Sequence, residues 1–382
     1  MSQTYRSPWM DSDLEFFRDN VRRFFAEEVV PHQERWYKQH FVDRDLWYKA
    51  AELGLLALDM PEEYGGCGGT FAHLAIFFEE QAAVGDWGFG VQVHHIVAHY
   101  ILNHGTEEQK RKYLPKMAAG EMIGAIAMSE PGAGSDLQGI RTRAVRDGDD
   151  YVINGSKTFI SNGSMADVAV VVTKTDPNAG SKGISLFIVE TKNSAGFGVG
   201  RVLEKIGQHN ADTAELSFQD VRVPAANLLG GIEGKGMYQL MSDLVYERMG
   251  CAVGSVATIE TAVRLTVEYV RDRKVFGKPL LELQNTRFKL AEADTQATLA
   301  RVFVDHCIQR MLEGTMDPIT AAKAKLWTSE MQGKVIDECL QLFGGYGYMM
   351  EYPIARMYID ARVQRIYAGT NEIMKEIIAR SL

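Results

Sequence analysis

The sequence is poor in cysteine and has no long apolar run. Its four cysteines are widely spaced and form no Cys-x-x-Cys pair, which favours a reducing compartment over a disulfide-stabilised secreted fold. No stretch approaches the roughly 18 apolar residues that a membrane-spanning helix needs. The opening segment MSQTYRSPWM lacks the basic and apolar layout of a cleaved signal peptide. Together these absences predict a cytoplasmic protein with no membrane span.

An excess of positive charge is also absent. The chain has 41 Lys and Arg residues against 50 Asp and Glu residues, so its net charge is −9. This is the wrong sign for a protein that binds nucleic acid or an anionic membrane surface. Hydrophobic residues make up 46% and charged residues 24% of the 382 residues, which excludes wholesale disorder and leaves room for two or three domains.

Apolar residues recur at helical spacing through the first third of the chain. The first predicted helix begins with a capping box at Ser12 and Glu15 and ends at Pro31. Three further helices are predicted over residues 45–56, 70–84 and 106–117. This part of the chain is therefore expected to be helical.

Strand patterns replace the helical spacing near residue 124. The dipeptide Asn154-Gly155 lies between two strand-like runs, 151–153 and 157–160, and predicts a two-residue hairpin turn. Further strands are predicted over residues 167–173, 184–190 and 214–223, and helices over 234–273, 283–312 and 318–342. The order is helical, β, then helical, and the absence of βαβ alternation argues against a doubly wound parallel sheet.

Two patterns have both a functional and a structural interpretation. The segment AMSEPGAGSD, from Ala127 to Asp136, has glycines that let backbone N–H groups approach a ligand, but an ordinary turn explains it equally well. His95 and His99 have the spacing at which two imidazoles on one helix could bind a metal. The Glu of a zinc-protease motif is absent, so histidines with ordinary hydrogen-bond partners are favoured. We therefore predict no metal site.

Glu247 is the carboxylate that most resembles a catalytic group. On a helix it shares its face with the apolar residues Leu240 and Cys251. A carboxylate in such surroundings has a raised pKa and suits a general base. A structural ion pair at a subunit contact is an equal alternative. Gly250 and Gly254 remove bulk beside it, which leaves room for a ligand or for another helix.

Five segments, taken together and in order, resemble the acyl-CoA dehydrogenases. They are AMSEPGAGSDL, INGSKTFISNG, DRKVFGKPLLELQ, QLFGGYGY and IYAGTNEIMKEIIAR. The match spans nearly the whole chain, and the long-chain members are the most similar. It implies an α+β fold with an N-terminal helical domain over residues 1–123, a middle β-domain over 124–232 and a C-terminal four-helix bundle over 233–382.

The resemblance implies an FAD-dependent oxidoreductase of fatty acid β-oxidation, usually a homotetramer. The family reaction removes an α-proton from a medium-chain, long-chain or branched acyl-CoA while the β-hydrogen leaves as hydride to flavin N5, which gives the trans-2-enoyl-CoA. Electrons then pass to an electron-transferring flavoprotein. Two alternatives remain open: an acyl-CoA oxidase-like enzyme that uses oxygen, which the short chain disfavours, and a catalytically silent member that binds FAD and acyl-CoA.

The resemblance also assigns expected cofactor contacts by position. The flavin ring would contact Ile126, Ala127, Met128, Ser129, Gly134, Ser135, Phe159, Ile160 and Ser161. A neighbouring subunit would offer Arg273, Gln284, Gln341, Leu342, Phe343, Gly344 and Gly345 to the pyrophosphate and adenosine. The pocket would be completed by Thr370, Asn371 and Glu372.

Many family members carry the base immediately before the Gly-Thr of the C-terminal motif, where this chain has Ala368. Long-chain and isovaleryl enzymes resemble this chain in carrying a Glu-Arg pair on a bundle helix instead, which implies Glu247 as the base. The backbone N–H of Ala368 would still bind the thioester oxygen, because every residue except Pro keeps that donor. The expected substrate-binding residues are Ser135, Tyr238, Met241, Leu244, Arg248 and Gly369.

Overall fold

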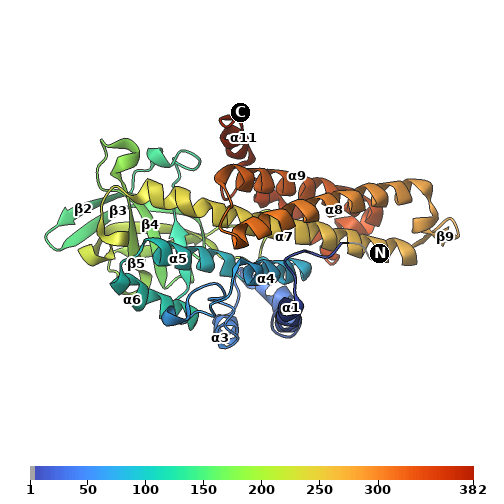
Figure 1. Ribbon diagram of the computed structural model, residues 1–382, viewed down its shortest axis with the longest axis horizontal. Helices are drawn as coiled ribbons and strands as arrows, with labels where there is room; N and C mark the ends of the chain where they lie inside the picture. The colour runs from blue at the N-terminus through green and yellow to red at the C-terminus, as the bar shows by residue number, and fades with distance from the viewer. Residues whose placement is uncertain (1–4) are drawn as a thin grey trace.

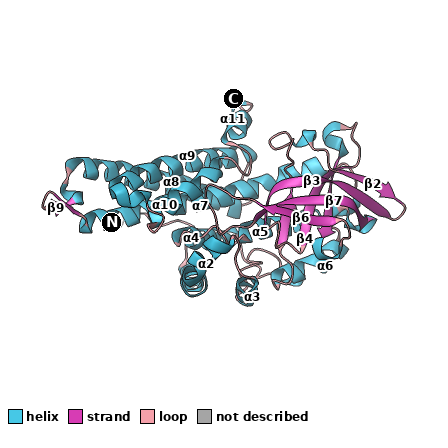
Figure 2. Cartoon of the chain, turned by 180° about the vertical axis from the view of Figure 1, so that it is seen from behind, coloured by secondary structure: helices cyan, strands magenta, loops and turns pink. Residues whose placement is uncertain are grey.

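A computed structural model describes residues 5–382 of the chain. A β-domain lies at one end of an elongated molecule, and three long helices extend from it to the other end (Figure 1). Shorter N-terminal helices pack along one side of both parts (Figures 1 and 2). Among the described residues, no helix combines the length and the apolar character needed to cross a membrane.

Six helices form the N-terminal part. They are α1 (Ser12–Phe24), α2 (Gln33–Gln39), α3 (Arg44–Glu52), α4 (Phe71–Ala83), α5 (Val91–His104) and α6 (Glu107–Ala118). The predicted start of the first helix is wrong by one residue, because Asp11, not Ser12, caps it by accepting from the N–H groups of Asp13 and Leu14. Its predicted end is also wrong: α1 ends at Phe24, and helical turns continue through Pro31 into α2.

The middle of the chain forms one seven-stranded sheet. Its strands are β1 (Gly124–Ala127), β2 (Arg143–Asp147), β3 (Asp150–Ser161), β4 (Val168–Lys174), β5 (Ile184–Glu190), β6 (Phe197–Val202) and β7 (Thr213–Pro224). Their order is β1-β4-β2-β3-β7-β6, and β5 pairs with β4. β4 pairs in parallel with β1 and with β2, and the other pairs of this sheet are antiparallel. This mixed sheet agrees with the predicted absence of a doubly wound fold.

The predicted hairpin at Asn154-Gly155 is wrong, because β3 runs through both residues without turning. A bulge interrupts the register with β7 between Ile153 and Gly155. Gly155 has φ of 154°, and a Cβ there would lie 2.4 Å from Oγ1 of Thr142. Glycine is therefore required for close packing against the neighbouring segment and not for a turn.

The C-terminal part contains three long helices, α7 (Gly236–Asp272), α8 (Gln284–Leu312) and α9 (Pro318–Phe343), which pack side by side (Figure 1). The two-stranded ribbon β8 (Lys274–Val275) and β9 (Lys278–Pro279) joins the first two. The fourth helix, α10 (Pro353–Asp360), is short and packs against α9 and α7, and α11 (Asn371–Ala379) packs against α9. The domain boundaries at 123/124 and 232/233 fall in the links beside β1 and α7 and stay a prediction.

Buried side chains form three clusters that fix these parts together. The largest contains Trp47 and Phe77 of the N-terminal helices and Val256 of α7. Alternate residues of β4 face opposite sides of the sheet. Val170 joins the second cluster, with α5 and α6, and Val171 joins the third. Because residues of α5, α7 and one face of the sheet pack together in the second cluster, the positions of these three elements relative to one another are fixed.

Candidate active site

The site is built where α5 lies against α7. Glu247 of α7 is 7% exposed, and its Oε1 accepts a 3.1 Å hydrogen bond from the hydroxyl of Tyr100 of α5. Burial raises the pKa of Glu247 to about 7. The Tyr100 hydroxyl and the Arg248 charge oppose this rise in pKa, whereas the Asp243 charge adds to it. A carboxylate whose pKa lies near neutrality can both take and return a proton.

A second carboxylate, Asp243, lies one helical turn before Glu247 and is also buried. Its two oxygens accept from Nδ2 of Asn103 at 2.7 Å and pair with Nε2 of His104 at 2.8 Å. Both partners belong to α5, like Tyr100. One face of α5 therefore supplies the polar contacts of both buried carboxylates of α7.

The loop before α11 is held by Arg248, the residue of α7 that follows Glu247. Arg248 donates from Nε to the carbonyl oxygen of Ala368 at 3.4 Å. Ala368 has φ of 53°, a left-handed conformation that residues with a side chain rarely adopt and that surrounding contacts must maintain. Gly369 follows with φ of 88°. The structure thus brings Arg248, the neighbour of Glu247 in the chain, together with Ala368 and Gly369.

A fully buried lysine of α9 holds the same loop from behind. Lys325 donates from Nζ to the carbonyl oxygen of Gly369 and to Oδ1 of Asn371, each at 2.8 Å. Burial lowers the pKa of Lys325 to about 8, so most of this ammonium group stays protonated at neutral pH. Thr370 caps α11 through Ile373, and Glu372 lies exposed in its first turn.

The glycine-rich segment after β1 is shaped by a buried ion pair. Nζ of Lys157 donates to Oε1 of Glu130 at 2.9 Å and to the carbonyl oxygen of Met128 at 3.0 Å. The N–H of Thr158 donates to the carbonyl oxygen of Ser129 at 3.0 Å, which joins this segment to β3. The structure therefore places the two predicted flavin segments, one after β1 and one on β3, next to each other.

Several residues of these segments are open to a ligand. Phe159 is 69% exposed and has φ of 61°. A Cβ on Gly132 or Gly134 would have no neighbour within 4 Å. The remaining predicted residues of these segments differ in exposure. Ile126 and Met128 pack against the second cluster, and Ala127 and Ile160 are buried. Ser161 is partly buried, and Ser135 is exposed.

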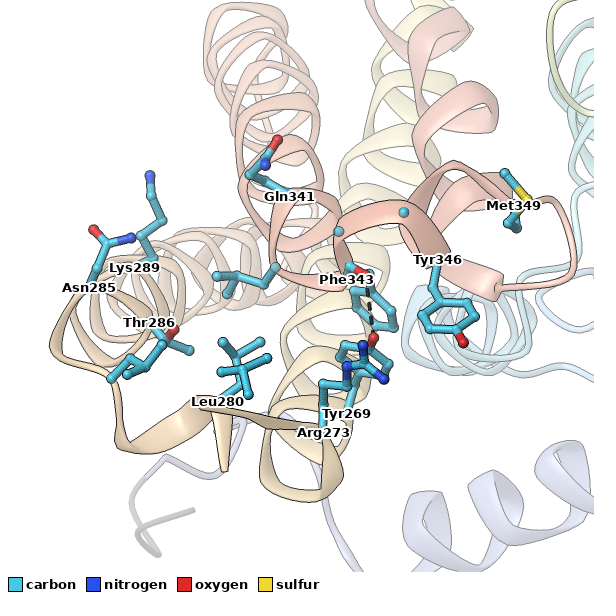
Figure 3. A pocket seen from close by; sticks show the side chains of 15 residues that line it. Tyr269, Arg273, Leu280, Asn285, Thr286, Lys289, Gln341, Phe343, Tyr346 and Met349 are labelled. Carbon is cyan, nitrogen blue, oxygen red and sulfur yellow. Dashed lines mark hydrogen bonds between the residues drawn. The ribbon is translucent and has the colours of Figure 1, made fainter. Parts of the chain in front are cut away.

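A second group of predicted cofactor residues lies at the far end of the bundle. A cavity of about 770 Å³ opens there between the C-terminus of α7 and the end of α9, lined by Arg273 and the whole 341–345 segment (Figure 3). The Tyr269 hydroxyl donates to the carbonyl oxygen of Phe343 at 3.3 Å. Gln284 is exposed at the start of α8, but its two neighbours line this cavity.

The far-end residues lie at a large distance from Glu247 within one chain. Arg273 lies 26 residues beyond Glu247, and α7 runs between them as one helix. At 1.5 Å per residue this places them about 39 Å apart. Within this chain, the far-end cavity is therefore remote from Glu247.

The expected substrate residues on α7 are divided between surface and interior. Tyr238 is 69% exposed and Met241 46% exposed, whereas Leu244 is partly buried. The space beside Gly250 and Gly254 is filled by other side chains: a Cβ at these positions would lie 2.5 Å from Nε2 of Gln92 and 3.2 Å from the ring of Trp87. These glycines therefore permit close packing.

His95 and His99 have separate partners. Nε2 of His95 lies 3.1 Å from the carbonyl oxygen of Leu55, and Nε2 of His99 lies 3.0 Å from the carboxylate of Asp59. Within residues 5–382, no three His, Cys, Asp or Glu side chains gather in a way that could hold a metal ion.

Sequence reasoning missed three residues of the site: Tyr100, Lys325 and Lys157. Tyr100 lies on α5, a helix that was not predicted, because nearly every side of it is buried and its apolar spacing is weak. Lys325 and Lys157 look like surface lysines in the sequence. Their partners are far away in the chain, so only the folded structure shows that they are buried.

The comparisons with known proteins agree on one family. Residues 11–121, 125–221 and 234–382 match the acyl-CoA dehydrogenase N-terminal, middle and C-terminal domains, respectively. The chain is 50% identical over 374 residues to the long-chain specific acyl-CoA dehydrogenase, mitochondrial, of Sus scrofa, an alignment that covers 97% of this chain and 86% of the relative. It is 38% identical over 376 residues to the isovaleryl-CoA dehydrogenase, mitochondrial, of Solanum tuberosum, with coverage of 97% and 91%. The crystal structure of acyl-CoA dehydrogenase from Geobacillus kaustophilus is similar with a TM-score of 0.95 at 48% identity, over 98% of this chain and 99% of that one.

Proposed function

The chain belongs to the acyl-CoA dehydrogenase family, and we propose that it oxidises a medium-chain, long-chain or branched acyl-CoA to the trans-2-enoyl-CoA. Membership makes it an oxidoreductase. The observation that carries the reaction is the buried Glu247 carboxylate, whose pKa is raised to about 7 and whose neighbour Arg248 binds the loop of Ala368. The names of the long-chain and isovaleryl relatives support the choice of acyl groups.

We propose FAD as the cofactor. The residues present fit it, because the exposed Phe159 and the unobstructed Gly132 and Gly134 border a segment whose backbone is fixed by Lys157. The segments 126–129, 134–135 and 159–161 would hold the flavin, with residues 370–372 completing the pocket. FAD bound there would supply the acceptor for the hydride that leaves the β-carbon.

Glu247 would take the α-proton, so the carboxylate becomes a carboxylic acid as the Cα–Cβ double bond forms. Its raised pKa makes it a stronger base than an exposed glutamate. The N–H of Ala368 would donate to the thioester oxygen and stabilise the charge that develops there. Tyr238, Met241, Leu244, Arg248 and Gly369 would line the approach of the acyl-CoA, and Ser135 would contact it from the β-domain.

The proposal is tested by mixing the FAD-loaded protein anaerobically with straight and branched saturated acyl-CoAs and following the flavin absorbance. Bleaching by wild type, with loss of about 10²–10⁴-fold in rate in Glu247→Gln at unchanged FAD content, is expected. A yellow wild-type protein that no acyl-CoA bleaches would contradict dehydrogenation. Hydrogen peroxide formed stoichiometrically in air would favour the oxidase-like alternative.

We also propose that the enzyme works as a homotetramer and passes electrons to an electron-transferring flavoprotein. The distance of about 39 Å along α7 between Glu247 and Arg273 supports a site completed by a neighbouring chain. Arg273→Gln is then expected to lose FAD, whereas a monomer that retains FAD would contradict the arrangement. The cytoplasmic location stays a prediction, because the relatives from Sus scrofa and Solanum tuberosum are named mitochondrial.

A further inference from the structure

We propose that Tyr100 is a positioning residue for the base, and that its hydroxyl serves both the charged and the protonated state of Glu247. The inference rests on the proposed function, in which Glu247 gains a proton in each turnover. It assigns a role to α5, which carries none of the residues expected from the sequence. Two contacts of the Tyr100 side chain and the neighbouring residues of α5 support it.

The first contact is the hydrogen bond to the carboxylate. The Tyr100 hydroxyl lies 3.1 Å from Oε1 of Glu247, and its side chain is completely buried. A donated hydrogen bond stabilises a buried carboxylate and fixes its orientation. Before the reaction, the hydroxyl therefore stabilises the charged form of Glu247 and orients its carboxylate.

The second contact is a spare acceptor. The carbonyl oxygen of Leu240 lies 3.5 Å from the same hydroxyl. After Glu247 gains the α-proton, its carboxylic acid can donate to the Tyr100 oxygen while the phenol proton turns to Leu240. Both states of the base then keep a hydrogen-bond partner, and no buried donor is left unpaired. Tyr100 retains its own proton throughout, because burial raises its pKa well above the ordinary value.

The third observation concerns the rest of α5. Three and four residues after Tyr100, this helix supplies Asn103 and His104 to the carboxylate of Asp243. The charged or titratable groups acting on Glu247 are Tyr100 from α5 and Asp243, Arg248 and Cys251 from α7. From α9, Lys325 acts on both Arg248 and Cys251. Among these groups, Tyr100 is the one that donates a hydrogen bond to Glu247.

Tyr113 of α6 provides a matched control. It is 1% exposed, packs in the same cluster as Tyr100, and its hydroxyl also donates to a glutamate, Glu190, at 3.1 Å. Tyr113→Phe and Tyr100→Phe therefore remove the same atom from similar surroundings. Only Tyr100 contacts the proposed base.

The experiment measures the rate of anaerobic flavin reduction against pH in wild type, Tyr100→Phe, Tyr113→Phe and Glu247→Gln. In Tyr100→Phe the acid limb is expected to move up by about one pH unit, with a several-fold lower plateau and little change in KM, because the carboxylate loses a donor. Tyr113→Phe is expected to keep the wild-type midpoint. The protonated carboxyl group of Glu247 gives an infrared band that Glu247→Gln lacks. In Tyr100→Phe without substrate, the pH midpoint at which this band disappears should move up by the same amount as the acid limb.

The outcomes separate this inference from the proposed function. If Glu247→Gln is inactive and Tyr100→Phe keeps the wild-type midpoint in both measurements, the role of Tyr100 is overturned and the base assignment stands. If Glu247→Gln remains active, both fail. Should Tyr100→Phe not fold, 3-fluorotyrosine at position 100 keeps the shape and strengthens the donor. It is expected to move the acid limb to lower pH, and an unmoved limb would overturn the role.

Discussion

Lys325 holds the carbonyl oxygen of Gly369 at 2.8 Å from inside the helical bundle. The same ammonium group binds Oδ1 of Asn371, and Arg248 binds the preceding carbonyl of Ala368 from the side of α7. Two buried cations thus bind consecutive carbonyl groups of one loop. Their contacts help to keep Ala368 in a left-handed conformation, and they hold the loop that carries its N–H, the proposed oxyanion donor.

Lys325→Met is expected to lower the rate of flavin reduction by about 10–100-fold. The loop would lose a donor that positions it, and a displaced oxyanion donor costs about this much. Because Lys325 also binds Asn371, which is proposed to complete the flavin pocket, the rate is compared per molecule of bound FAD. Lys334→Met, an exposed position on the same helix, is the control and should match wild type. An unchanged rate in Lys325→Met would show that Arg248 alone fixes the loop.

Wild-type activity is expected to rise with pH through about 7, because Glu247 must be charged to accept a proton. Asp243→Asn removes a negative charge that raises the pKa of Glu247, so the midpoint should move to lower pH. This direction is opposite to that expected for Tyr100→Phe. Stopped-flow flavin reduction across pH measures both, and an upward shift in Asp243→Asn would contradict the electrostatic account.

The fold class and the order of the three parts were predictable, because they depend on periodicity that each segment carries by itself. The long helices α7, α8 and α9 lie within two residues of their predicted limits. The hairpin prediction was wrong because Asn-Gly favours a turn locally, whereas Gly155 is required by its close packing against Thr142 in a neighbouring segment. Local pattern cannot report a contact that only the assembled sheet creates.

In the candidate site, the residue pattern by itself pointed to the proposed base and not to its partners. Glu247 carries a local signal, since it interrupts an apolar helix face and precedes Arg248. Its partner Tyr100 lies 147 residues earlier in the chain and carries none. The far-end residues such as Arg273 were recognisable by resemblance alone, because in a single chain they line a cavity remote from Glu247.

Arg301→Met is expected to lower the free energy of unfolding by about 3–5 kcal/mol, the usual cost of removing one partner from a buried ion-pair network. Arg301 of α8 pairs with Glu79 of α4, with Glu260 of α7 at 2.6 Å and with Asp305 at 3.4 Å. Glu79 and Asp305 are buried and would lose this cation. The exposed pair partner Arg264 gives the control, since Arg264→Met should change stability by less than about 1 kcal/mol in denaturant unfolding.

Asp360→Asn is expected to change how stability depends on pH. Asp360 ends α10, is 2% exposed, and accepts from the Tyr37 hydroxyl at 3.0 Å and from the N–H of Gln208. It therefore joins the bundle to both other parts. Burial raises its pKa from 3.8 to about 6, so between pH 4 and 6 the folded protein binds more protons than the unfolded chain. The contribution of Asp360 to stability then falls by about 3 kcal/mol as pH rises through this window.

The variant cannot lose a proton at this position, so its stability relative to wild type should improve by about that amount between pH 4 and pH 7. Asp317, which caps α9, gives a control of opposite sign. Its hydrogen bond from Thr320 lowers its pKa to about 2, so its stabilising effect is complete above pH 4 and is lost only on further acidification. Asp317→Asn should therefore destabilise the protein by a constant amount between pH 4 and pH 7, the range over which Asp360→Asn becomes more stable relative to wild type. Unfolding by denaturant at pH 4, 5, 6 and 7 measures both, and parallel curves for Asp360→Asn and wild type would show that Asp360 stays charged in the fold.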